Sequence, residues 1–415
     1  IYDGIEANGI RFGVEGGEAV TIEGGILNSG RVSALAYDAN AVGIRLSSGV
    51  TTPQFINDGD MTAAASSDVS STVTTLLIEA GANLPTFINN GQFLASSGGG
   101  TADLTALHDL SGTLTSITNT GSMQSNIFAN AAGDPITGSA TLINVEANTP
   151  GVTIIQDGIA SSPPGTTNPD TDGDGVPDSD EPAMVGAIRF GSGADMFDIR
   201  NGAVLGDISF GDGLDTLSIT GGAFVRGILS DSDSLLDVAV SDGSLDLSQT
   251  TMMDITNLTI GSDGRLVVSI DGNNGTSSGF NVSGTATLED GAELGVRFTS
   301  LIDGPGRFTV IDANNLNFGN LDMDGVAANA PYLFILDAGA DLPNNQVYVD
   351  VRRRTAEEAG LISVEASAYD AIYDALDRDA GILNAFINQS GREGFIDLYE
   401  QMLPDHSGGP LLSLA

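Results

Sequence analysis

The sequence predicts an all-β protein, a right-handed parallel β-helix with a C-terminal strand-rich cap and short terminal α-helices. Three observations predict this class. Short runs of β-branched and aliphatic residues alternate with turns rich in Gly, Asn and Asp along most of the 415 residues, of which 55 are Gly. Similar units recur about every 30 residues in the first part of the chain and every 20 residues further on. Near the C-terminus the apolar residues change to helical spacing.

Residues 1–160 are predicted to form N-terminal repeats of about 30 residues. Asn-x-Gly units recur at Asn28, Asn57, Asn89 and Asn119, with offsets of 29, 32 and 30, and Gly-Ile-Arg at 9–11 returns at 43–45. A unit this short cannot bury its own apolar face, so we expect neighbouring units to stack with strands about 4.7–4.9 Å apart. The equivalent Asn side chains then form a ladder, which we prefer to a catalytic role because turns select Asn and Gly.

Residues 183–300 are predicted to form shorter units of about 20 residues. The pattern Phe-Gly-x-Gly-x-Asp in 190–199 returns in 210–219, and the trailing stretch 202–208 aligns with 222–228, both at an offset of 20. Later units begin at Leu258 and Ala286.

This alignment makes Asp195 and Asp215 equivalent, about 5 Å apart on adjacent units. Two carboxylates at that distance repel by roughly 3 kcal/mol at an effective dielectric near 20. The sequence pattern Gly-x-Gly-x-Asp around these aspartates resembles the calcium-binding repeats of RTX proteins, but those repeats have about nine residues and the offset here is 20. We therefore favour aspartates in solvated turns, with a bridging Ca²⁺ as the alternative.

The C-terminal part differs in residue composition and spacing. Residues 301–354 are rich in β-branched and aromatic residues and are expected to form a hairpin-like cap. Residues 355–415 are expected to be a helical linker, because Thr355 and Glu358 match a capping box. Helical apolar spacing covers 366–376, 382–387 and 395–402.

Between the two kinds of repeat, a Pro- and Asp-rich linker over 161–182 contains a candidate metal site. Its possible oxygen ligands are Asp170, Asp172, Asp174, the Val176 carbonyl, Asp178 and Glu181. With Gly175 at the sixth position, this is the full pattern of a calcium loop. Ca²⁺ takes about six to eight oxygens at about 2.3–2.6 Å, and so many carboxylates would repel one another without a cation. The sequence predicts Ca²⁺ here; the alternative is an acidic, solvated linker.

Prolines on both sides of the loop, including Pro169 and Pro182, exclude the helices of an EF-hand. The loop resembles the calcium repeats of thrombospondin type 3 modules, which are non-helical and lie between domains. That resemblance implies a calcium-stiffened joint between two halves of the chain.

Charge and composition exclude several classes of function. Fourteen basic residues, all Arg, stand against 55 acidic ones, for a formal net charge of −41. Such a field repels nucleic acid, so we expect no nucleic-acid partner. Cys is absent, which removes thiol chemistry. No apolar run is long enough for a transmembrane helix.

The order of parts at the C-terminus carries a family resemblance. Repeats are followed by a strand-rich segment ending in Val347-Tyr-Val-Asp-Val-Arg-Arg-Arg-Thr355, then by Ala368 to Leu376, then by Tyr399 to Gly409. This order resembles the passenger of a Gram-negative type V autotransporter. The resemblance implies an extracellular location at the outer membrane and a folding-nucleating, autochaperone role for 300–350. It also implies a cognate outer-membrane β-barrel as a partner outside this chain.

We therefore expect a calcium-stiffened adhesin or surface scaffold that binds a host or bacterial surface glycan or protein. One alternative is a polysaccharide lyase or hydrolase on the same rod, with Asp198, Arg200, Asp212 and Arg226 as its candidate patch. Another is a homo-oligomeric surface array. We expect no catalytic residue at His108, placed in a polar turn, or at His406, placed in the linker.

Overall fold

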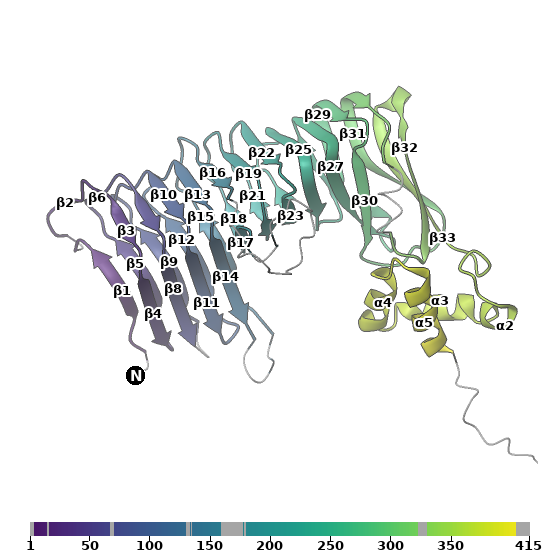
Figure 1. Ribbon diagram of the computed structural model, residues 1–415, viewed down its shortest axis with the longest axis horizontal. Helices are drawn as coiled ribbons and strands as arrows, with labels where there is room; N and C mark the ends of the chain where they lie inside the picture. Colours follow the sequence, from purple (N-terminus) through teal and green to yellow (C-terminus); the bar gives the residue numbers. More distant parts are fainter. Residues whose placement is uncertain are drawn as a thin grey trace, which may run out of the picture.

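The computed structural model describes residues 4–14, 16–66, 70–129, 133, 135–158, 177, 180–322 and 330–403. Strands make up 51% of the chain and helices 9%, in agreement with the predicted all-β class. Most strands lie in large parallel sheets, an arrangement compatible with an all-β parallel solenoid. Figure 1 shows them stacked along the long axis, with the helices beneath the C-terminal end of the stack.

Three rows of parallel strands run along the stack, and each repeat contributes one strand to each row. Row A contains β1 (Ala7–Phe12), β5 (Ala41–Leu46), β9 (Thr72–Ile78), β12 (Asp103–Asp109), β15 (Ala140–Asn144), β18 (Ala187–Arg189), β21 (Ile208–Ser209) and β24 (Leu229–Ser230). Row B contains β3 (Ile26–Asn28), β7 (Phe55–Asn57), β10 (Thr86–Asn89), β13 (Ser116–Asn119), β16 (Thr153–Gln156), β19 (Met196–Ile199) and β22 (Asp215–Ile219). Row C contains β4 (Arg31–Tyr37), β8 (Asp60–Ser66), β11 (Gln92–Gly98), β14 (Ser122–Phe128), β17 (Ala183–Val185), β20 (Ala203–Leu205) and β23 (Phe224–Gly227). The short strands β2 (Val20–Thr21) and β6 (Val50–Thr51) form a separate pair.

The pairing register confirms the N-terminal repeat offsets. Asn28, Asn57, Asn89 and Asn119 are successive partners in row B. Alternate side chains of each strand point inward, so that one apolar cluster runs from the first repeats to the C-terminal helices. Within it, Phe55 and Phe87 lie with ring centroids 6.0 Å apart.

A ladder of side-chain amides lies at the C-terminal ends of the row B strands, as predicted, and every member except Asn28 is buried. The side-chain amide of Asn28 donates to Asn57 at 2.7 Å, Asn57 donates to Asn89 at 2.7 Å, and Asn89 donates to Asn119 at 2.9 Å. Asn119 donates to the side-chain oxygen of Gln156 at 3.2 Å. Each amide both donates and accepts, so the ladder satisfies its own polar atoms inside the stack.

The rows continue without a break across the segment 159–179. β14 pairs directly with β17, and β16 pairs with β19. The segment is therefore an insertion into one continuous stack, rather than a joint between two separate halves.

The predicted offset of 20 holds between β19 and β22 in row B but not between β20 and β23 in row C. Met196 pairs with Thr216 at an offset of 20, whereas Val204 pairs with Val225 at an offset of 21. The turn before β23 holds one additional residue, and a slip of one residue exchanges the two faces of a strand. As a result Val225 is buried while Phe224 faces outward and is 37% exposed.

Further strands close the stack after β24. They are β25 (Leu236–Leu247), β26 (Met252–Ile255), β27 (Asn257–Asp271), β28 (Thr276–Ser277), β29 (Gly279–Leu288) and β30 (Glu293–Phe298). Leu258 pairs with Ala286 at an offset of 28 residues, so this unit is longer than the 20 residues predicted for 183–300.

An antiparallel cap follows, formed by β31 (Gly306–Phe318), β32 (Phe334–Asp341) and β33 (Gln346–Arg353). β31 also pairs in parallel with β29, so the cap extends the stack. This arrangement matches the expected hairpin-like cap. A short 3₁₀ turn, η1 (Leu342–Asn344), joins β32 to β33.

Four helices end the described chain: α2 (Ser363–Ala366), α3 (Tyr369–Leu376), α4 (Ala380–Ile387) and α5 (Arg392–Met402). The capping box forms as predicted, with reciprocal bonds between Thr355 and Glu358, but it closes a turn rather than a helix. The Tyr373 hydroxyl donates to the Ile302 carbonyl at 2.7 Å, which fixes the helices against the cap. None of the described helices is long and apolar enough to span a membrane.

Candidate functional site

The outward face of row C changes character between β23 and β30. On the earlier strands β17 and β20, its outward positions hold small or aliphatic residues such as Ala183 and Leu205. Further along, strand pairing brings charged and polar residues side by side in two columns. One column is Phe224, Ser244, Arg265 and Glu293, and the other is Arg226, Asp246, Val267 and Gly295.

Asp246 is the centre of this group. Its carboxylate is 7% exposed and accepts a hydrogen bond from Arg297 at 3.1 Å, with a second contact to the same guanidinium at 3.0 Å. Arg226 approaches it from the neighbouring strand at 3.3 Å. Burial raises the pKa of Asp246, while Arg297, Arg226 and Arg265 act to lower it.

Arg297 is held on more than one side. Its guanidinium donates to the Ser269 hydroxyl at 2.8 Å and to the Leu247 carbonyl at 3.1 Å, as well as to Asp246. Burial lowers its pKa, an effect that Asp246 opposes. A guanidinium fixed in this way is pre-oriented and partly desolvated, which strengthens its interaction with any further anion.

Arg265 and Arg226 are less enclosed. The Arg265 guanidinium lies 3.8 Å from Glu293 and passes close to Gly295, where an added Cβ would come within 3.0 Å of its Nη2 atom. The Arg226 side chain is 50% exposed. Gly295 thus leaves room for the arginine beside it.

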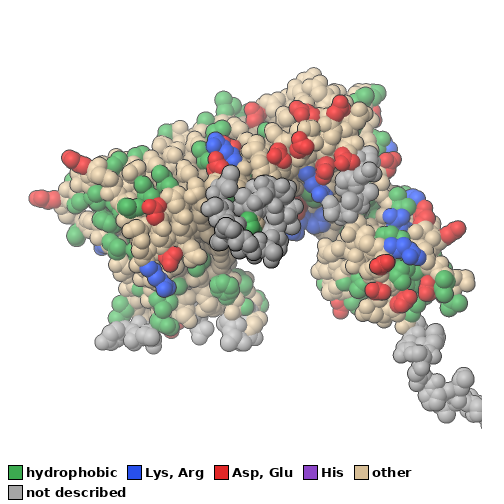
Figure 2. Space-filling view, viewed as in Figure 1, with side chains coloured by type: hydrophobic (Ala, Val, Ile, Leu, Met, Phe, Trp, Pro, Cys, Tyr) green, Lys and Arg blue, Asp and Glu red, His purple; other side chains and the backbone are tan. Residues whose placement is uncertain are grey.

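Six of these residues line a cavity of about 380 Å³: Phe224, Ser244, Asp246, Arg265, Val267 and Arg297. Its opposite wall comes from Pro331, Ile387 and Asn388, at the start of the cap's second strand and the end of α4. In Figure 2, basic side chains gather in the hollow between the strand stack and the helical segment. The volume falls within the range of small-molecule sites.

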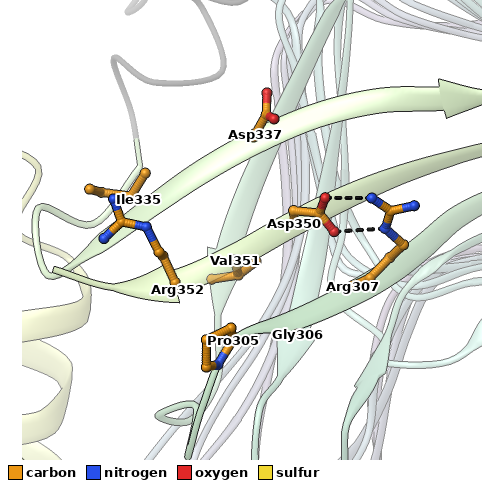
Figure 3. Close-up of a pocket in the computed structure, with 8 residues that line it drawn as sticks. All are labelled: Pro305, Gly306, Arg307, Ile335, Asp337, Asp350, Val351 and Arg352. Carbon is orange, nitrogen blue, oxygen red and sulfur yellow. Dashed lines mark hydrogen bonds and ion pairs between the residues drawn. The ribbon is translucent and has the colours of Figure 1, made fainter.

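A second cavity of about 350 Å³ lies on the cap, between β31, β32 and β33. Figure 3 shows Arg307 and Asp350 side by side on neighbouring strands among its lining residues, joined by two hydrogen bonds of 2.8 and 2.6 Å. Arg307 also lies 3.6 Å above the ring of Tyr348. Arg307 and Asp350 already neutralise each other across paired strands. We therefore interpret this ion pair as a structural feature of the cap rather than as a binding site.

Asp195 and Asp215 do not lie in solvated turns, contrary to our expectation, since each is only 1% exposed. Asp195 accepts a hydrogen bond from the Val152 amide at 2.6 Å, and Asp215 accepts one from the Asp195 amide at 2.7 Å. Each carboxyl thus ties its repeat to the preceding one through a single oxygen. The other oxygen is buried without a hydrogen-bond partner.

This burial raises the pKa of Asp195 to about 6 and that of Asp215 to about 7. Repulsion between the two carboxylates, and from Asp231 and Asp233, adds to the shift of Asp215. Protonation near neutral pH therefore relieves the repulsion for which the sequence suggested a bridging Ca²⁺. Within the described ranges, no group of three or more acidic or His side chains is arranged to hold a metal ion.

Five of the six predicted calcium ligands, Asp170, Asp172, Asp174, Val176 and Asp178, lie outside the described residues. The sixth, Glu181, is described; it is half-buried and lies two residues before β17. The calcium loop therefore remains a prediction.

The residues of the alternative catalytic patch do not assemble. Arg200 pairs with Asp198 at 2.6 Å, Asp212 accepts from the Ser232 hydroxyl, and Arg226 pairs with Asp246. His108 lies on strand β12 rather than in a turn, and burial lowers its pKa. His406 lies outside the described residues.

Sequence reasoning found Arg226 but missed Asp246, Arg265 and Arg297. Their offsets across the strands are uneven, at 20, 21 and 28 residues for the column that contains Arg265, so no repeat pattern marks them. The available signal was the rarity of basic residues, since three of the chain's 14 arginines meet here.

Comparisons with known proteins gave no match to this chain, whether with protein-family models, curated proteins or solved structures.

Proposed function

We propose that the protein is a surface-displayed rod, a right-handed parallel β-helix of the autotransporter-passenger type that acts as an adhesin or scaffold. The observation that supports this best is the unbroken stack. Rows B and C pass the insertion at 159–179 without losing register and end in an antiparallel cap. A continuous ladder of strands resists bending, which suits a protein that presents a binding surface at a distance.

The proposal includes two partners beyond the chain. The cap and helical segment lead toward a cognate outer-membrane barrel, and the side of the rod meets a glycan or protein on a host or bacterial surface. We also propose that the loop from Asp170 to Glu181 binds Ca²⁺. Since the strands on either side of the insertion pair directly, calcium would order the insertion against the rod rather than join two halves.

The test couples the purified chain to fluorescent beads through its C-terminus and measures adhesion to host cells, bacteria and immobilised polysaccharides. Saturable adhesion with no release of reducing ends or unsaturated products is expected. Beads carrying the heat-denatured chain control for its acidity. Turnover of a polysaccharide would instead support the enzyme alternative, and ordered assemblies growing on addition of calcium would support the array.

A further inference from the structure

The cavity between row C and α4 concentrates positive charge in a chain whose net charge is −41. Two guanidinium groups, those of Arg265 and Arg297, line it together with the carboxylate of Asp246, and a third, that of Arg226, pairs with Asp246 from the neighbouring strand. Glu293 lies only beside Arg265, at 3.8 Å. With Glu293 included, three guanidinium groups stand against two carboxylates, so this group of side chains is positively charged in a chain that is strongly acidic, which favours anions.

Protein groups hold the guanidinium groups of Arg226 and Arg297 in position. Asp246 contacts only one edge of Arg226, whose side chain is half exposed. Arg297 is oriented by Asp246, Ser269 and the Leu247 carbonyl, so its position does not depend on a ligand. A planar anionic group entering the cavity would therefore meet donors that are already in place, which lowers the cost of binding.

The rest of the cavity suits a ring with hydroxyl groups. Phe224 presents an outward-facing aromatic side chain at one side, while Ser244 and Asn388 supply hydroxyl and amide groups. Aromatic faces pack against apolar ring surfaces, and hydroxyl and amide groups pair with sugar hydroxyls. A cavity of about 380 Å³ is large enough for one or two sugar rings.

We propose that this cavity binds an acidic sugar unit, a ring that carries a carboxylate or a sulfate, with Arg265 and Arg297 receiving the anion, Arg226 adding positive charge beside Asp246, and Phe224 packing against the ring. This proposal rests on the proposed adhesive function and names the chemistry of its ligand. It assigns no reaction to the cavity.

The experiment measures binding to the full chain by calorimetry. The probes are glucuronate and galacturonate oligosaccharides, a sulfated galactose, the neutral sugars of the same size, and inorganic sulfate alone. The acidic sugars are expected to bind and the neutral ones not. Preference for the carboxylated or the sulfated set identifies the source of the anion. Inorganic sulfate binding as tightly as the sugars would overturn the assignment of a sugar ligand.

Variants locate the site. Arg265→Gln is expected to weaken binding roughly tenfold or more, since a hydrogen bond to a charged group contributes about 1.5–3 kcal/mol. Arg226→Gln is expected to weaken it less, since its guanidinium lies beside the cavity at Asp246. Arg200→Gln is the matched control: it removes an arginine of similar exposure, 46%, paired with Asp198 outside the cavity, and should leave binding unchanged. An equal loss in all three variants would show only a response to net charge and would overturn the site.

Gly295→Ala tests the geometry without altering any charge. The added methyl would come within 2.9 Å of Val267 and 3.0 Å of the Arg265 guanidinium, so that the arginine must move. Binding is expected to weaken while the melting temperature stays close to that of the parent, because the crowded atoms lie at the ends of side chains. Unchanged affinity in this variant, together with unchanged affinity in Arg265→Gln, would place any ligand elsewhere.

Bead adhesion of the same variants separates this proposal from the adhesive function. Saturable adhesion of the parent that Arg226→Gln and Arg265→Gln leave intact would overturn the cavity as the site and leave adhesion standing. Binding of acidic sugars that the variants abolish, without adhesion to any surface, would support the cavity and overturn the adhesin.

Discussion

Two polar ladders run inside this molecule, and they use opposite chemistry. In the repeats before residue 160, stacked amides from Asn28 to Gln156 lie at the C-terminal ends of the row B strands. In the repeats after residue 180, the carboxyls of Asp195 and Asp215 lie at the N-terminal ends of two row B strands, β19 and β22. An amide offers both donor and acceptor, so it can repeat indefinitely. A carboxylate only accepts hydrogen bonds, so each one leaves a buried, charged oxygen without a hydrogen-bond donor unless it takes up a proton. Identical stacking thus gives a pH-independent ladder in one region and a titrating one in the other.

The largest effect is expected from giving the first ladder the chemistry of the second. Asn89→Asp removes the donor to Asn119 and sets a carboxylate against the Asn119 oxygen at a position that is 0% exposed. We expect a loss of about 3–5 kcal/mol in unfolding free energy at pH 7, in line with an unpaired buried charge. Denaturant titration measures it. Asn126→Asp, on the partly exposed face of β14, is the control and should cost under about 1 kcal/mol. Equal losses would show that the ladder contributes nothing special.

The converse change removes the titration from the second ladder. The folded-state pKa values of Asp195 and Asp215, about 6 and about 7, lie above the ordinary value of 3.8. The folded state therefore binds these protons more tightly, and their contribution to stability is complete below about pH 4 and lost as the pH rises to about 7. Relative to an Asp195→Asn variant, the parent should lose about 3 kcal/mol across that window, because the pKa of Asp195 is raised by about 2 units and one unit corresponds to about 1.4 kcal/mol. A stability difference that is constant with pH would contradict the buried-carboxyl interpretation.

Calcium is expected to act at the boundary between the two regions. A ligand at a hundred times its dissociation constant adds about 2.7 kcal/mol to the unit that binds it. A thermal melt in millimolar Ca²⁺ against EDTA should show this increase in the parent and little of it in Asp172→Ala plus Asp174→Ala. Glu393→Ala plus Glu400→Ala, which removes two exposed carboxylates from α5, should respond to calcium like the parent. Because the stack is continuous, we expect one transition in EDTA; two separate transitions would show that the regions unfold independently.

The smallest effect tests the register of the second region. Val225 is 1% exposed and Phe224 is 37% exposed. Val225→Ala should therefore cost about 2 kcal/mol, and Phe224→Ala under about 1 kcal/mol. The offset of 20 expected from the sequence would reverse this order, so a pair of urea titrations decides between the two registers.

The sequence by itself determined the repeats. The Asn-x-Gly spacing fixed the register from Asn28 to Asn119, because a self-complementary amide stacks on its own copy. The capping pair Thr355 and Glu358 and the strand-rich cap were also readable, since both depend on local residue types. The small number of basic residues was also visible in the sequence, but the sequence did not show that three of the arginines lie close together.

Only the tertiary structure decided burial and proximity. It placed Asp195 and Asp215 inside the stack, carried the rows past the insertion, and turned Phe224 outward through one added residue in a turn. It also brought Asp246, Arg265 and Arg297 together from three strands and set the end of α4 over them. The physical reason is that a strand's face depends on register to the single residue, and register across uneven repeats is set by how the whole stack packs rather than by any local pattern.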